Sequence, residues 1–163
     1  MRTISEGVEW ALHCCTLLAV VPDGTALPAS RLAEFHGVPA AYLAKHLQVL
    51  AAAGILDSVP GRKGGYRLAH RPADISLLDV VEAVEGDEAA FRCTEIRQRG
   101  PAALARSRYV KPCGLASAMW AAEDAWRAEL ARRTVADLLG GLAVDVPVDA
   151  AVKAAAWLQE VSR

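Results

Sequence analysis

The chain has 163 residues, the size of one compact domain with room for an appended arm. Hydrophobic residues make up 53% and charged residues 23%, with 18 basic against 19 acidic side chains, which excludes an intrinsically disordered chain and a uniform polycation. No apolar run reaches the ~20 residues of a membrane helix, and acidic residues precede the apolar stretch 10–21. We therefore expect a cytoplasmic protein with reduced thiols and no membrane association.

The first third of the chain predicts three helices in close succession. Residues 4–21 contain no helix breaker, and a turn signal follows them. A second helix is expected over 30–37, with Ser30 as a good N-cap residue, and a third over 39–54, with leucines at three- or four-residue steps. Because a short turn with a glycine joins the last two, the pattern is typical of a helix-turn-helix.

A short hairpin is expected directly after the third helix. Residues 55–59 read as a strand, 60–65 as a glycine-rich basic loop and 66–68 as the returning strand. A helix with a capping box at Ser76 follows and ends at Gly86. The order predicts a winged helix-turn-helix, a mainly α fold with a small β-wing.

The rest of the chain predicts a loop and more helices. We expect a winged helix-turn-helix domain at 1–86, an irregular loop at 87–114, a long helix at 115–139 and a helical extension at 140–163. Apolar residues of the long helix recur at three- or four-residue steps, the pattern of a helix that packs on a partner helix. The extension predicts one amphipathic helix at 148–161.

Positive charge is concentrated in the predicted helix-turn-helix and wing. Residues 29–72 carry a net charge of +4 and the remainder carries −5. This segregation is typical of a surface that binds DNA phosphates, and side chains off the leucine seam can reach base edges. The candidate DNA contacts are Ser30, Arg31, Tyr42, Lys45, His46, Gln48 and, at the tip of the wing, Arg62 and Lys63.

Three stretches carry a resemblance to a known family: Tyr42-Leu43, the run Leu50 to Leu56, and the wing Gly64-Gly65-Tyr66-Arg67-Leu68-Ala69. Over roughly residues 1–139 the chain resembles the winged-helix transcription regulators typified by IscR, NsrR and CymR. The resemblance implies a repressor that binds a palindromic operator as a homodimer paired through the long helix. In many members it also implies an iron-sulfur cluster in the loop before that helix.

The cysteines of this loop depart from the pattern of three closely spaced ligands. Only Cys93 and Cys113 are present, with nineteen residues between them, whereas a 2Fe-2S cluster takes four protein ligands. In this respect the chain is similar to the redox-sensing RsrR-type members, whose cluster the resemblance implies is held by two Cys, one His and one Glu across the dimer. Carried over, this set is Cys93, Cys113, His13 and Glu9, with Trp10 as a residue that couples cluster state to packing.

Glu9 and His13 are four residues apart and therefore share one face of the first helix. Glu6, one turn earlier, is an alternative carboxylate. Cys14 and Cys15 are assigned to packing, although Cys14 is an alternative ligand.

Two other functions stay open. One is a cluster-free thiol switch, in which Cys93 and Cys113 form a reversible disulfide or react singly. The other is a zinc-stabilised module whose helix-turn-helix binds protein. No nucleophile–base grouping and no phosphate-binding loop of Walker spacing is recognisable, so we do not expect an enzyme.

Overall fold

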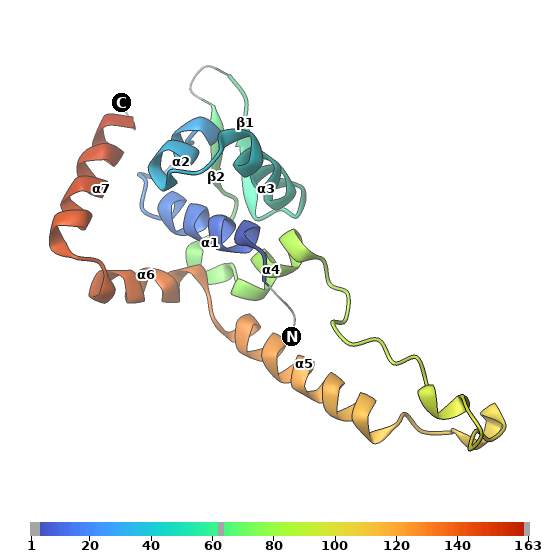
Figure 1. Ribbon diagram of the computed structural model, residues 1–163. Helices are drawn as coiled ribbons and strands as arrows, with labels where there is room; N and C mark the ends of the chain where they lie inside the picture. The colour runs from blue at the N-terminus through green and yellow to red at the C-terminus, as the bar shows by residue number, and fades with distance from the viewer. Residues whose placement is uncertain (1–3, 62–63, 162–163) are drawn as a thin grey trace.

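The computed structural model describes residues 4–61 and 64–161 and consists of a helical body from which one long helix projects (Figure 1). The body contains α1 (Glu6–Leu18), α2 (Ala29–His36), α3 (Ala40–Ala52), the hairpin of β1 (Leu56–Val59) and β2 (Gly65–Leu68), and α4 (Leu77–Glu85). Helix α5 (Gly114–Arg132) leads back from the far end, and α6 (Val135–Asp145) and α7 (Val148–Val161) lie against the body. The arrangement confirms the mainly α fold with a small β-wing. The predicted wing tip, Arg62 and Lys63, lies outside the described residues.

Helix α1 lies at the centre of the core. Eight of its thirteen residues are buried, and it contacts α3, α4, α6 and β2. Cys14 and Cys15 are fully buried on its inner side, as expected for residues that serve packing. The leucine seam of α3, with Leu43 and Leu47, is fully buried as well, and each such leucine contributes about 1.5–3 kcal/mol to stability.

The wing hairpin is joined to the body by a backbone contact. The strands pair antiparallel, with Leu56 opposite Leu68, and Leu27 exchanges two hydrogen bonds of 2.8 and 2.9 Å with Tyr66. This contact explains the second wing glycine: a Cβ on Gly65 would lie 2.2 Å from the carbonyl oxygen of Leu27, and the φ of Gly65 is +150°. Only glycine permits this approach.

The predicted long helix at 115–139 is wrong beyond Arg132. Helix α5 ends at Arg132, and a new helix begins after Thr134 and continues through Gly140 and Gly141. The break has two causes. Thr134 and Asp137 form a capping box, and the backbone at 133–135 pairs with residues 75–77 through Leu77 N to Arg133 O (2.8 Å) and Val135 N to Ile75 O (3.0 Å).

Other helix limits are close to expectation. The capping box of Ser76 and Asp79 is present, and α7 has the predicted limits. The N-cap of α2 is Pro28, however, and Ser30 stands in the first turn, so the capping role expected for Ser30 is wrong. The loop at 87–114, expected to be irregular, contains short 3₁₀ turns at Ile96–Gln98 and Arg106–Arg108.

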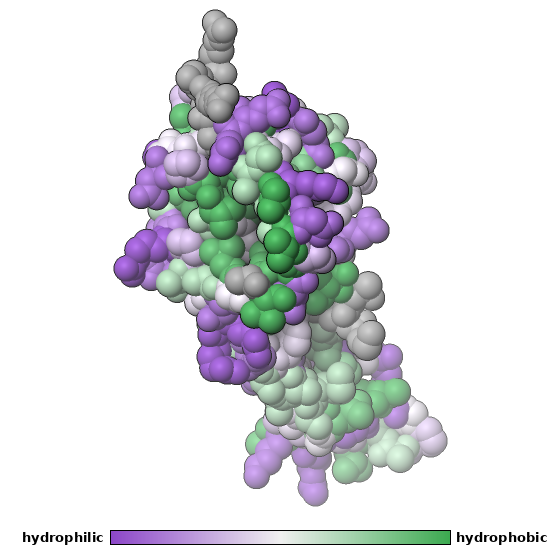
Figure 2. Space-filling view, turned by 90° about the vertical axis from the view of Figure 1, so that its left-hand side faces the viewer, coloured by the Kyte–Doolittle hydropathy of each residue, from purple (hydrophilic) through white to green (hydrophobic). Residues whose placement is uncertain are grey.

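Apolar side chains are exposed on the face that carries α7. Figure 2 shows them over this helix and its junction with α6, where Val144, Val148 and Val152 are 83, 81 and 63% exposed. Within the described ranges, no helix combines the length and the hydropathy that crossing a bilayer requires.

We predict that Gly65→Ala lowers the free energy of unfolding by at least about 2 kcal/mol, because the new methyl group collides with the Leu27 carbonyl. Gly140→Ala is the matched control, since a Cβ there meets nothing within 4 Å and its position is helical; stability should stay unchanged or rise by ~0.5–1 kcal/mol. Urea denaturation followed by circular dichroism measures both. Equal effects of the two variants would contradict the close approach.

Candidate DNA-binding surface and sensor residues

The exposed face of α3 carries the candidate base-reading residues. Tyr42 is 59% exposed, and Lys45 and Gln48 are exposed beside it. The Lys45 ammonium lies 5.1 Å from the centre of the Tyr42 ring, a cation–π distance. His46 differs, because its half-buried ring lies at the contact between α3 and α1. These polar side chains project away from the leucine seam, as expected for a recognition helix.

Three arginines of the basic segment are engaged in surface ion pairs. Arg31 contacts Glu34 at 2.8 Å, Arg67 contacts Asp57 across the hairpin at 3.1 Å, and Arg71 contacts Asp74 at 2.8 Å. Exposed pairs of this kind contribute little to stability, so a DNA phosphate can exchange for the carboxylate at low cost. Glu34 and Asp57 are already included in the net charge of +4 for residues 29–72, whereas Asp74 lies outside that segment and lowers the positive charge of this surface further.

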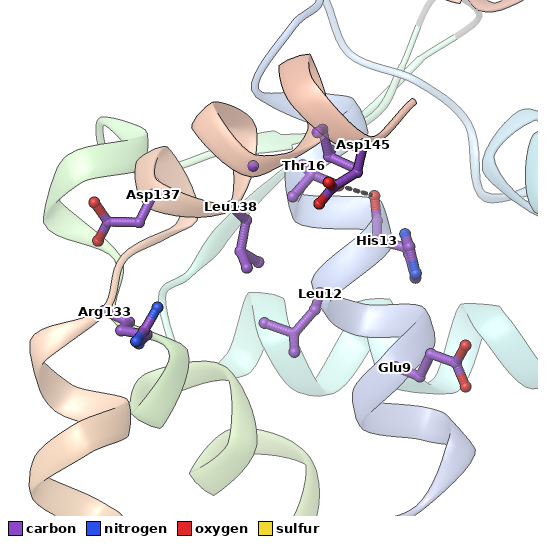
Figure 3. Close-up of a pocket in the computed structure, with 10 residues that line it drawn as sticks. Glu9, Leu12, His13, Thr16, Arg133, Asp137, Leu138 and Asp145 are labelled. Atoms are coloured by element: carbon purple, nitrogen blue, oxygen red, sulfur yellow. Dashed lines mark hydrogen bonds between the residues drawn. The ribbon is translucent and has the colours of Figure 1, made fainter. Parts of the chain in front are cut away.

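Glu9 and His13 project from the same side of α1, one turn apart, and both are exposed (Figure 3). They line one rim of a pocket of about 400 Å³ between α1 and α6, whose apolar part includes Leu12 and Leu138. The ring of His13 lies 5.7 Å from the ring of His36. Burial of His36, and next the charge of His13, lower the pKa of the His36 imidazole.

Trp10 connects this face of α1 to the recognition helix. Its ring meets the Tyr42 ring edge-on at 6.4 Å and the His46 ring at 6.1 Å between centroids. The His46 ring also fills the space beside Gly7, where a Cβ would lie 2.4 Å from Cε1. Trp10 directly follows Glu9 in the sequence. A displacement of the backbone at Glu9 therefore reaches a side chain that contacts α3.

The two loop cysteines lie at the two ends of a segment that a single arginine organises. The Arg97 guanidinium pairs with Glu95 (2.5 and 2.8 Å), donates to the carbonyl of Lys111 (3.0 Å) and lies 4.9 Å from the centre of the Tyr109 ring. The Tyr109 hydroxyl donates to the Arg97 carbonyl at 2.6 Å. This network holds the segment between Cys93 and Cys113 in a folded shape.

Each loop cysteine accepts a backbone hydrogen bond and is partly exposed. The Cys93 sulfur accepts from Glu95 N at 3.4 Å, and the Cys113 sulfur caps α5 by accepting from Ala116 N at 3.3 Å. The charge of Cys113 is among the factors that raise the pKa of Arg97, after the hydrogen bond and charge of Glu95. Both sulfurs are therefore reachable from solvent, and each has a backbone N–H group as a hydrogen-bond partner.

Within one chain the four predicted ligands form two separate pairs. Glu9 and His13 lie on the body, whereas the loop with Cys93 and Cys113 lies at the far end of α5 (Figure 1). Among the described residues, no three His, Cys, Asp or Glu side chains are grouped closely enough to hold a metal ion. A four-ligand site built from this set requires residues of two subunits.

Sequence reasoning missed Arg97 and Tyr109. Their positions between the two cysteines were the available signal, but a loop without periodicity does not reveal that these side chains contact each other. Glu95, which pairs with Arg97, has the uncommon φ of +50°, which no pattern in the sequence predicts.

A comparison with protein families shows which family the chain belongs to. The model of the Rrf2 family, described as iron-dependent transcriptional regulators, matches residues 4–141. The chain belongs to the Rrf2 family. This family consists of transcriptional regulators, which confirms that the protein is not an enzyme and confirms the resemblance given by the wing motif.

Curated relatives of this Rrf2 protein carry names of the same kind. It is 30% identical over 139 residues to an HTH-type transcriptional regulator of Mycobacterium tuberculosis, covering 85% of this chain and 81% of the relative. It is 37% identical over 83 residues to the HTH-type transcriptional regulator YwgB of Bacillus subtilis, where the match spans 51% of this chain and about half, 53%, of YwgB.

Solved structures share the fold of this Rrf2 protein at lower identity. CymR, the global cysteine regulator of B. subtilis, superposes with a TM-score of 0.65 at 22% identity, covering 86% of this chain and 98% of CymR. IscR of T. potens superposes with a TM-score of 0.63 at 23% identity, covering 86% and 88%. These superpositions show the fold, and the family match to transcriptional regulators gives it the coarse function of DNA binding.

We predict that in the reduced, metal-free protein iodoacetamide modifies Cys93 and Cys113 but neither Cys14 nor Cys15. Burial raises the pKa of each of the latter two to about 12, with the charge of Cys14 adding to the shift of Cys15, so both stay protonated and shielded at mildly alkaline pH. Mass spectrometry locates the modified residues. In denaturant all four should react; rapid modification of Cys14 in the folded protein would contradict the assignment to packing.

Proposed function

We propose that the chain is a cytoplasmic, homodimeric transcription repressor that binds a palindromic operator and senses redox state through a 2Fe-2S cluster. In this proposal Glu9 and His13 of one subunit and Cys93 and Cys113 of the other hold the cluster. The observation that carries it is the position of Trp10, which follows Glu9 on α1 and contacts both Tyr42 and His46 of α3.

The chemistry of the donor set supports this assignment. Two thiols in a polar loop and an exposed imidazole–carboxylate pair together make four ligands of types that iron accepts, and His in place of Cys raises the reduction potential. Each pair alone supplies only two of the four protein ligands that a 2Fe-2S cluster takes. When bound, the cluster supplies a one-electron redox change.

The surface of α5 supports the homodimer. Of its nineteen residues only Ala116 is buried, while Leu115, Met119 and Trp120 are 67, 45 and 37% exposed. A projecting helix with large apolar side chains in water is unfavourable unless a partner covers them. A second copy of the same helix is the occupant that a homodimer supplies.

The residues of the chain provide a route from the ligand pairs to DNA. A shift of α1 moves Trp10 against Tyr42 and His46, because both rings already contact the indole. In a dimer the two α3 helices must match half-sites one helical turn apart, ~34–36 Å. A small displacement of α3 therefore changes the fit to the operator.

We expect anaerobically prepared protein to be red-brown, with visible absorption that dithionite bleaches. His13→Ala and Glu9→Gln should change this spectrum, because each removes one proposed ligand. Glu6→Gln is the matched control: it removes the same charge one turn earlier on α1 and should leave the spectrum unchanged.

A changed spectrum for Glu6→Gln alone would transfer the carboxylate role to that residue. Colourless protein would contradict the cluster. It would favour the thiol switch, since Cys93 and Cys113 are both free and partly exposed.

We also expect salt-dependent DNA binding through α3. Lys45→Gln should weaken binding to duplex DNA roughly three- to ten-fold and reduce the slope of log affinity against log salt by about one, because one phosphate contact is lost. Lys111→Gln, an equal charge change in the cysteine loop, is the control and should bind like the unmodified protein. Fluorescence anisotropy across a salt titration measures both, and a flat salt response would favour a protein-binding module instead.

A further inference from the structure

Helix α7 lies beyond the family match, which ends at residue 141, yet it is docked on the DNA-binding domain. Figure 1 shows it beside α2. The Trp157 ring packs against the Phe35 ring of α2 with centroids 4.8 Å apart, and Leu158 and Val161 contact the core. Helix α7 therefore covers part of the helix that carries Arg31.

Charged side chains stand on both sides of this aromatic contact. Lys153, one turn before Trp157, lines the same groove as Glu34 near the end of α2. Glu160, three residues after Trp157, is close enough to Arg31 in the first turn of α2 for its charge to contribute to the raised pKa of Arg31, after the larger effects of Glu34. The two helices therefore run antiparallel at this contact, with Lys153 towards the Glu34 end of α2 and Glu160 towards the Arg31 end.

Two carboxylates act on the guanidinium of Arg31. Its Nη1 donates to Glu34 Oε2 at 2.8 Å, and both side chains are about half exposed, at 47 and 52%. The pKa of Arg31 is raised first by this hydrogen bond, next by the charge of Glu34 and further by the charge of Glu160. A phosphate that approaches Arg31 meets both negative charges.

We propose that Glu160 sets the DNA affinity of this surface: docked α7 holds the Glu160 carboxylate where it opposes a DNA phosphate at Arg31. The inference rests on the proposed DNA contact of Arg31. The packing of Trp157 on Phe35 keeps the C-terminal turn of α7 near Arg31, and the Glu160 carboxylate is the charge that repels the phosphate. Docked α7 thereby lowers the affinity of the chain for DNA, and neutralising the Glu160 carboxylate removes this effect.

The experiment uses the full chain and a fluorescently labelled random-sequence DNA duplex of about 30 base pairs, long enough for two half-sites one turn apart. Glu160→Gln should tighten binding about two- to five-fold, the range expected for one exposed charge, and make the salt dependence steeper. Asp149→Asn is the matched control, because it removes an equal charge from the first turn of the same helix. It should change affinity less than Glu160→Gln does.

Glu160→Gln in an Arg31→Gln background tests whether Glu160 acts through Arg31, separately from whether the chain binds DNA. Loss of the Glu160→Gln effect in that background, with weaker binding overall, supports an action through Arg31. Three outcomes would overturn the role of Glu160 while leaving the proposed DNA binding intact. They are an equal gain in DNA affinity from Glu160→Gln in both backgrounds, an equal gain from Asp149→Asn, and no gain from Glu160→Gln. Absence of salt-dependent binding by the unmodified chain contradicts the proposed function and this inference with it.

Discussion

Helix α1 is held against α3 so closely that the ring of His46 occupies the space where any residue other than glycine at position 7 would place its side chain. The other features of the molecule depend on this contact. The inner side of α1 is buried among α3, α4 and α6, so the helix cannot rotate freely, while its outer side carries Glu9 and His13 in the open. One helix is thereby both the centre of the core and the carrier of the proposed sensor pair.

The position of the proposed DNA-binding surface follows from the same packing. Trp10 meets α3 from α1, and Leu27, between α1 and α2, binds the wing strand through two backbone hydrogen bonds. Contacts with α1 and with Leu27, which follows it, therefore position both α3 and the wing. Such a close-packed connection transmits a displacement, because a well-packed interior does not absorb it.

Much of the fold was predictable because it rests on local chemistry. Leucines at helical spacing placed α3, Ser76 and Asp79 placed the start of α4, and Gly64-Gly65 marked the wing. The break between α5 and α6 was not predicted, although Thr134 and Asp137 are a capping box in the sequence as well. The apolar spacing runs across the break, and the second of its two causes, the pairing of residues 133–135 with 75–77, joins segments that are far apart along the chain.

Residue patterns were enough to predict the winged-helix order, the basic segment and the placement of Glu9 and His13 on one helical face, because periodicity and spacing are local properties. Three contacts became visible only in the folded chain: Trp10 meets Tyr42 and His46, Arg97 organises the cysteine loop, and α7 docks on α2 through Trp157. These contacts join residues distant along the chain. Their geometry depends on how whole helices pack, which residue spacing does not encode.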